Sequence, residues 1–135
     1  DTVQFGKAFI MREGRDFALI TTGHTLDLGL DWVRSWVAER LDPFHVSMHT
    51  IKPLDTDLIE SLVRDGMSII TLEEHSIIGG LGSAVSEIAA SIRSSSVIVR
   101  RGIHDFFSHH VGSHQVLRDY FGLSARPDPR VLGLC

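Results

Sequence analysis

The sequence has a single cysteine, its last residue, Cys135, and too few basic residues to balance its acidic ones, so that its formal net charge is −4. One cysteine excludes a disulfide framework, and no secretory signal is visible, so we expect a cytoplasmic protein. The acidic balance is not that of a nucleic-acid-binding protein. No apolar run approaches the ~20 residues of a membrane-spanning helix. These absences predict a chain that binds neither nucleic acid nor membrane.

Three catalytic signatures are also missing. The sequence has no GK[S/T], which excludes a P-loop, and no HExxH, the helical histidine pair of many zinc enzymes. Ser76 and Ser83 lack the GxSxG pattern of a nucleophile elbow. We therefore assign no catalytic, cofactor-binding or metal-binding residue to this chain.

The composition, with 43% hydrophobic and 22% charged residues over 135 positions, is that of one globular domain spanning residues 1–135. Apolar and β-branched runs predict five strands, at residues 7–12, 17–22, 44–48, 67–72 and 96–100. Helical spacing predicts four helices: 25–41, one between the N-cap Asp55 and the stop signal Gly66, one around 85–92, and 113–121. In the first helix, the apolar stripe comprises Leu26, Leu30, Val33, Val37 and Leu41, with Trp32 and Trp36 alongside.

The alternation of strands and helices predicts an α/β fold, with a mainly parallel sheet and helices on both of its faces. A short turn separates the first two strands, so we expect the first strand to run antiparallel to the others. The last stretch, residues 124–135, has no periodic pattern and is interpreted as an irregular tail.

A glycine-rich turn, "LEEHSIIGGLGSAV" at residues 72–85, joins the fourth strand to the third helix. Gly80 and Gly82 match the first two glycines of a GxGxxG nucleotide fingerprint, but Val85 occupies the third position. Glu73 and Glu74 would repel a phosphate if they faced it. Two hypotheses follow: a small-ligand or nucleotide site at Gly79–Gly82, or a tight turn in which glycine supplies φ > 0 and close packing.

Eight histidines are many for this length. The cluster His104–His114 contains four of them and could in principle supply metal ligands. Gly112 and Ser113, however, lie between His110 and His114 and interrupt the helical spacing of this pair. We therefore favour histidines on the surface and in loops without a metal site. His75 follows the fourth strand beside Glu74, a neighbour that could fit it for acid–base work. Without a nucleophile motif, we favour a histidine that anchors the loop or meets a neighbouring domain.

Four pieces of the chain resemble the C-terminal domain of the transketolase family. They are "FGKAFIMREGRDFALITTG", "IKPLDTDLIESLV", "ITLEEHSIIGGLGSAVSEIAA" and "GIHDFFSHHVGSHQVLRDYFGL", and they cover about residues 5–123. The family comprises thiamine-diphosphate enzymes, among them 1-deoxyxylulose-5-phosphate synthase and the β subunits of 2-oxo acid dehydrogenases. The piece "EEHSIIGGLGSAV" is most similar to proteins made with a separate C-terminal section. His104 departs from the family, in which proline is common at that position, and His110-Val111 interrupts an expected small residue.

The resemblance implies a three-layer α/β/α domain with a five-stranded mixed sheet whose first strand is antiparallel. It implies a transferase that moves two-carbon ketol units between sugar phosphates, with thiamine diphosphate and Mg2+ held by preceding diphosphate- and pyrimidine-binding domains. This domain would then serve assembly, in a homodimer or higher oligomer, and would be inactive alone. The start at Asp1 without methionine suggests a piece of a longer protein. We expect the domain contact at a loop that comprises Glu74, His75, Gly79, Gly80 and Gly82.

Overall fold

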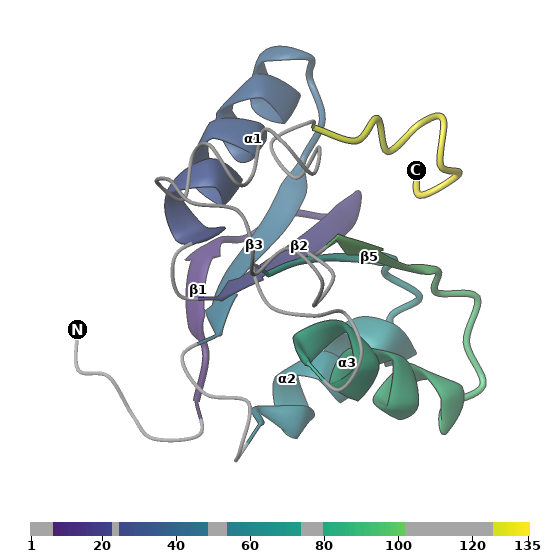
Figure 1. The fold of residues 1–135 in the computed structure, drawn as a ribbon. Helices are drawn as coiled ribbons and strands as arrows, with labels where there is room; N and C mark the ends of the chain where they lie inside the picture. The colour runs from purple at the N-terminus through teal and green to yellow at the C-terminus, as the bar shows by residue number, and fades with distance from the viewer. Residues whose placement is uncertain (1–6, 23–24, 49–53, 74–79, 102–125) are drawn as a thin grey trace, which may run out of the picture.

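The computed structural model describes residues 7–22, 25–48, 54–73, 80–101 and 126–135 (Figure 1). These residues form five strands and three helices: β1 (Phe9–Arg12), β2 (Phe17–Thr22), α1 (Leu26–Ala38), β3 (Pro43–Met48), α2 (Thr56–Arg64), β4 (Ile69–Leu72), α3 (Leu81–Ala90) and β5 (Ile98–Arg101). All five predicted strands and the first three predicted helices are confirmed, with ends that differ by a few residues. The helix predicted at 113–121 lies outside the described residues.

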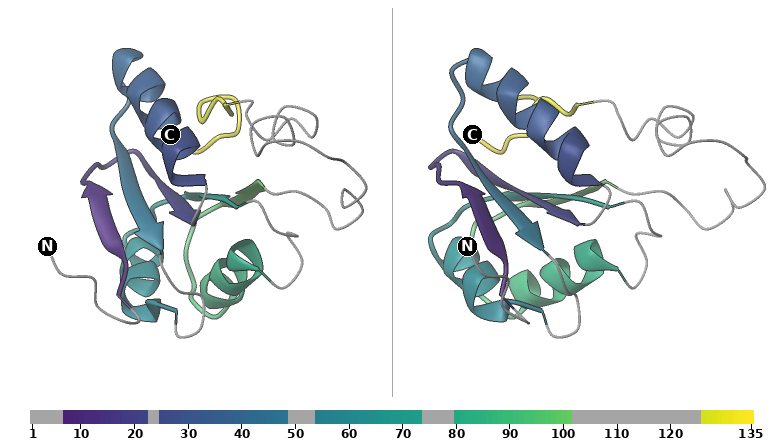
Figure 2. Two further views of the ribbon diagram at one scale, coloured as in Figure 1. Left: turned by 60° about the vertical axis from the view of Figure 1, so that its left-hand side comes forward. Right: turned by 90° about the vertical axis from the view of Figure 1, so that its left-hand side faces the viewer.

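The strands form one sheet in the order β1-β3-β2-β4-β5. β1 pairs antiparallel with β3, whereas the other three pairings are parallel. Helix α1 covers one face of the sheet, and α2 and α3 cover the opposite face (Figure 2). The predicted three-layer α/β/α domain with an antiparallel first strand is therefore confirmed.

Helix α1 packs on the sheet through Trp32, Trp36 and Val33, the last of which belongs to the predicted stripe. Its buried residues are Gly29, Trp32, Val33 and Trp36, whereas Val37 is 40% exposed. The ring of Trp36 meets that of Phe17 edge to face, with centroids 4.9 Å apart. Two indoles bury more apolar area than the leucines and valines of the predicted stripe, so the helix is rotated to bring them onto the sheet.

The helix α2 begins and ends where the sequence predicts. The Asp55 carboxylate accepts the Leu58 N–H at 3.3 Å as an N-cap, and it also accepts the Ala8 N–H at 2.9 Å next to β1. Gly66 ends the helix with φ = +78°, a conformation that favours glycine. Among the described residues, no helix has the length and the apolar character needed to cross a membrane.

Candidate domain-contact edge

The carboxyl ends of the four parallel strands lie at one edge of the sheet. Strands β2, β3, β4 and β5 run in the same direction, so their last residues, Thr22, Met48, Leu72 and Arg101, lie at this edge. In open α/β sheets, this is the edge at which functional groups gather. Of the predicted contact residues, Gly80 and Gly82 are described, whereas Glu74, His75 and Gly79 lie outside the described residues.

Glu73 faces the N-terminus of α3, and its role there as a helix cap was not predicted from the sequence. Its side chain is 1% exposed, and its carboxylate accepts the N–H of Leu81 at 2.8 Å and that of Gly82 at 3.2 Å. Its own N–H donates to the Arg101 carbonyl at 3.1 Å. Glu73 therefore closes the glycine turn by capping α3 from eight residues upstream, and the buried negative charge lies at the positive end of the helix.

The two described glycines are needed for close approach rather than for a left-handed backbone. A Cβ on Gly80, whose φ is −96°, would lie 2.8 Å from both carboxylate oxygens of Glu73. A Cβ on Gly82 would lie 2.5 Å from Cδ of Arg100. The predicted close packing is confirmed, but the predicted φ > 0 is wrong for Gly80, and among the described glycines only Gly66 and Gly133 have positive φ.

This arrangement argues against a phosphate cradle at Gly79–Gly82. A phosphate at a helix N-terminus needs free backbone N–H groups and a site without negative charge. Here the amides of Leu81 and Gly82 already donate to Glu73, and a second anion at that position would face a buried carboxylate. The sequence signal was present, because an acid follows the strand immediately before the turn, but its role as a cap eight residues upstream depends on how the turn folds back.

Arg100 and Thr71 complete the described part of this edge, side by side on neighbouring strands β5 and β4. Arg100 donates from Nη1 to Oγ of Ser83 at 3.1 Å, and its aliphatic carbons pack beneath Gly82. Thr71 is fully buried, and within the described ranges its hydroxyl is the buried side-chain atom that has no hydrogen-bond partner. A buried, unsatisfied hydroxyl destabilises the domain at this point.

His45, in the middle of β3, is the histidine that the structure describes, and no motif in the sequence marks it as functional. It is 1% exposed, and its Nε2 lies 3.1 Å from Oγ1 of Thr21. Burial lowers the pKa of His45 to about 4, so the ring is neutral at pH 7. Its place inside the α1 face makes it a core residue, and the cluster His104–His114 lies outside the described residues.

The described residues do not fit thiamine diphosphate and Mg2+. In the part of the chain that the structure describes, no group of three histidine, cysteine, aspartate or glutamate side chains could hold a metal ion. A diphosphate at the N-terminus of α3 would meet the Glu73 carboxylate.

Comparisons with known proteins agree with this fold. The family model "Transketolase, C-terminal domain" matches residues 6–127. A 1-deoxy-D-xylulose-5-phosphate synthase of Chlorobium luteolum is 39% identical over 120 residues, which are 89% of this chain and 19% of that protein. A putative transketolase C-terminal section of Methanocaldococcus jannaschii is 34% identical over 122 residues, which are 90% of this chain and 37% of that protein.

A solved structure is similar as well. A split gene transketolase, described as an inactive β4 tetramer, superposes with a TM-score of 0.81 and 31% identity over 92% of this chain and 40% of that chain. This chain thus spans between about a fifth and two fifths of the lengths of these relatives. Because the family model covers nearly all of it, the chain belongs to the transketolase C-terminal domain family.

Proposed function

We propose that this chain is the C-terminal domain of a thiamine-diphosphate-dependent, transketolase-like transferase, and that it serves assembly rather than catalysis. The observation that carries the proposal is the match to the transketolase C-terminal domain over residues 6–127, within relatives that are much longer than the match. The reaction we propose for the parent enzyme is the transfer of two-carbon ketol units between sugar phosphates.

In this proposal, thiamine diphosphate and Mg2+ bind to the preceding diphosphate- and pyrimidine-binding domains, on the same chain or on a separate one. The capped N-terminus of α3 supports this division, because Glu73 occupies the amides that a diphosphate would use. The carboxyl edge of the sheet, with the loop Glu74–Gly79 and the turn at Gly80 and Gly82, is the proposed contact with those domains. The cytoplasmic location expected from the single cysteine is part of the same proposal.

The solved split gene transketolase supports inactivity in isolation and self-association, since it is described as an inactive tetramer of β subunits. We propose that the purified chain is likewise inactive and forms a dimer or a larger oligomer. Sedimentation velocity measures the oligomeric state, and a monomer at micromolar concentration would contradict the proposed self-association.

The test of function uses the purified chain, alone and together with the polypeptide encoded immediately upstream. Each sample is assayed with thiamine diphosphate and Mg2+ for ketol transfer between sugar phosphates and for formation of 1-deoxy-D-xylulose 5-phosphate. We expect no turnover from the chain alone and turnover from the combined sample. Turnover by the chain alone would show that it is catalytic. A combined sample without either activity would contradict the proposed parent enzyme.

The proposed contact edge is tested in the combined sample by His75→Ala, with His45→Gln as the matched histidine variant inside the core. We expect His75→Ala to weaken the association of the two polypeptides, whereas folded His45→Gln associates like the unmodified chain. Equal association of His75→Ala and the unmodified chain would remove His75 from the contact.

A further inference from the structure

Residues 126–135 contain no helix or strand, and within them a hydrogen-bonded turn covers residues 129–133. Asp128 begins it by accepting the Arg130 N–H at 3.0 Å, and Pro129 occupies the next position, where its fixed φ is favourable. Gly133, with φ = +74°, ends the turn, and the Leu134 N–H donates to the Pro129 carbonyl at 2.8 Å. This is the pattern of a helix C-terminus closed by glycine, reduced to a single turn.

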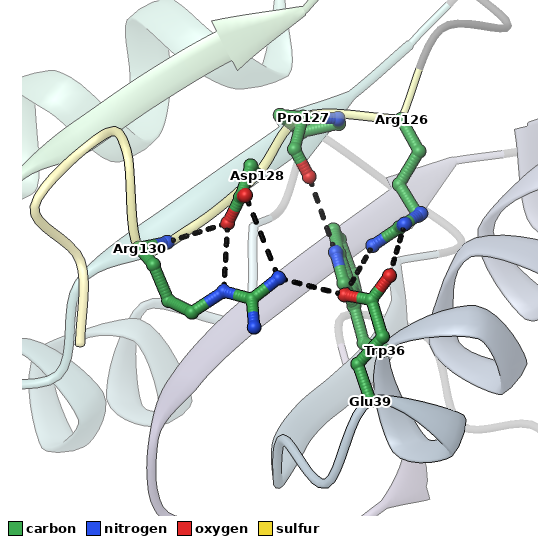
Figure 3. A network of polar contacts seen from close by, with 6 residues as sticks. All are labelled: Trp36, Glu39, Arg126, Pro127, Asp128 and Arg130. Carbon is green, nitrogen blue, oxygen red and sulfur yellow. Dashed lines mark hydrogen bonds and ion pairs between the residues drawn. The ribbon is translucent and has the colours of Figure 1, made fainter.

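An ion-pair cluster ties this turn to the end of α1 (Figure 3). Both carboxylate oxygens of Glu39 are used: Arg126 donates to Oε1 at 2.7 Å and to Oε2 at 3.3 Å, and Arg130 donates to Oε2 at 2.9 Å. Arg130 also pairs with Asp128 at 3.0 Å, so it is held from two sides. The hydrogen bond from Arg126 holds the pKa of Glu39 below its ordinary value, which keeps this carboxyl ionised at neutral pH.

Two contacts anchor the same segment in the α1 face. The indole N–H of Trp36 donates to the carbonyl of Pro127 at 3.1 Å, as Figure 3 shows. Leu134 is 6% exposed and belongs to the core cluster that contains Phe17 and Trp36. The two anchors lie near opposite ends of the segment, so the turn between them spans the surface beside α1.

We infer that residues 126–135 form an intramolecular clasp, which opens as a unit before the domain unfolds. The clasp is held on α1 by the ion pairs with Glu39, by the hydrogen bond from Trp36 and by the burial of Leu134. Ordering the ten residues of this segment has a large entropic cost. The contacts that offset this cost are few, and the ion pairs of Arg126 and Arg130 with Glu39 are partly exposed to solvent, which weakens them. Segments of this kind lie at the low-stability end of a protein. Opening would uncover the indole of Trp36 and the part of the core cluster that Leu134 covers. The clasp therefore controls the exposure of this apolar surface on the α1 face.

The clasp is independent of the proposed function, and the match to the family model ends at residue 127, before its turn begins. Its direct test is hydrogen exchange of the full chain, followed by mass spectrometry of the peptide 126–135 and of the peptides that contain β2 and β4. Glu39→Gln removes the charge that pairs with both arginines, and Glu87→Gln makes the same change at an exposed position on α3.

We expect Glu39→Gln to lower the protection of the 126–135 amides about tenfold, as for a cluster of partly exposed charge pairs, and to leave β2 and β4 unchanged. Sodium chloride at high concentration should act in the same direction on the unmodified chain. Glu87→Gln should leave the protection of residues 126–135, of β2 and of β4 unchanged. Clasp amides that exchange only together with β2 and β4, or a Glu39→Gln chain that matches Glu87→Gln, would overturn the inference.

Limited proteolysis gives a second readout. Trypsin cannot cleave after Arg126, because Pro127 follows, but it can cleave after Arg130 once the turn opens, which releases residues 131–135. We expect this product about tenfold faster from Glu39→Gln than from Glu87→Gln, since cleavage follows the population of the open form. Equal rates in the two variants would show that Glu39 does not hold the clasp closed.

Discussion

On the α2/α3 face of the sheet, helix ends are capped by side chains that are close in sequence, whereas the α1 face is closed by the far end of the chain. Asp55 caps α2 from within three residues, and Glu73 caps α3 across the glycine turn. In contrast, the side chain of Thr25 makes no capping bond to α1. The carbonyl of Pro127 accepts from Trp36 across 91 residues, and Leu134 belongs to the same core cluster as Trp36.

The two faces therefore differ in the contacts on which their stability depends. Capping groups near in sequence keep a helix in place even when distant contacts are lost. A face completed by a segment distant in sequence depends on a few long-range anchors, whose formation requires closing a long loop. Four sets of substitutions distinguish these two modes of closure by the stability that each set changes.

The largest effect is expected from Trp36→Ala on the α1 face. Trp36 is fully buried, and its loss should destabilise the domain by about 4 kcal/mol, as for large aromatic truncations. Urea unfolding measures the change, and Ile59→Ala, fully buried on the other face, is the matched truncation. Only Trp36→Ala should also remove the exchange protection of residues 126–135. Loss of that protection in both variants would contradict the separation of the two faces.

The next largest effect is the pH dependence that His45 gives to the α1 face. The folded pKa of about 4 lies below the unfolded value of 6.5, so the unfolded chain binds the proton more readily between these values. Stability from this group is complete above pH 6.5 and falls as the pH drops toward 4. The difference of 2.5 pH units corresponds to at most about 3 kcal/mol.

Urea unfolding at a series of pH values, compared between the unmodified chain and His45→Gln, isolates this contribution because the other histidines are common to both. The unmodified chain should lose more stability than the variant between pH 6.5 and 4. Parallel curves for the two chains would show that His45 is not the titrating core group.

Glu73→Ala tests the capping of the α2/α3 face. It should cost about 2 kcal/mol, because the amides of Leu81 and Gly82 lose a charged acceptor at a buried position. Sulfate should restore part of this loss, since the vacated helix N-terminus becomes an anion site. Thermal unfolding in sulfate and in chloride of equal ionic strength measures the rescue, with Glu87→Ala as the exposed control on the same helix. A sulfate response equal to that of the control would contradict the anion site.

The smallest effect, and the one of opposite sign, is expected from Thr71→Val. Replacing the unpartnered hydroxyl by a methyl group of similar shape should leave the domain unchanged or stabilise it by up to about 1 kcal/mol. Thr25→Val is the matched change, because the buried Thr25 hydroxyl donates to the Leu72 carbonyl at 2.8 Å. That variant should lose about 1 kcal/mol or more. Equal losses in urea unfolding would show that the Thr71 hydroxyl has a partner.

Much of the fold was predictable because its signals are local. Alternating segments, the turn between the first two strands, the cap Asp55 and the stop Gly66 each act within a few residues. Val37 belongs to the predicted apolar stripe of α1 but is exposed, since periodicity ranks apolar positions without weighing the area that each side chain buries against the sheet. The turn at 126–135 also had local signals, Asp128-Pro129 and Gly133, but its partners are on α1.

The order and type of the elements, the antiparallel first strand and the family of the domain could all be predicted from the sequence, because they depend on short-range patterns and on shared motifs. Only the tertiary structure decided the roles of Glu73, His45 and Glu39. Each of these side chains meets its partners on another element, and burial there, rather than residue type, sets what its charge or ring can do. The physical reason is that a cap, a neutral core histidine and a clasp are relations between segments that only folding brings together.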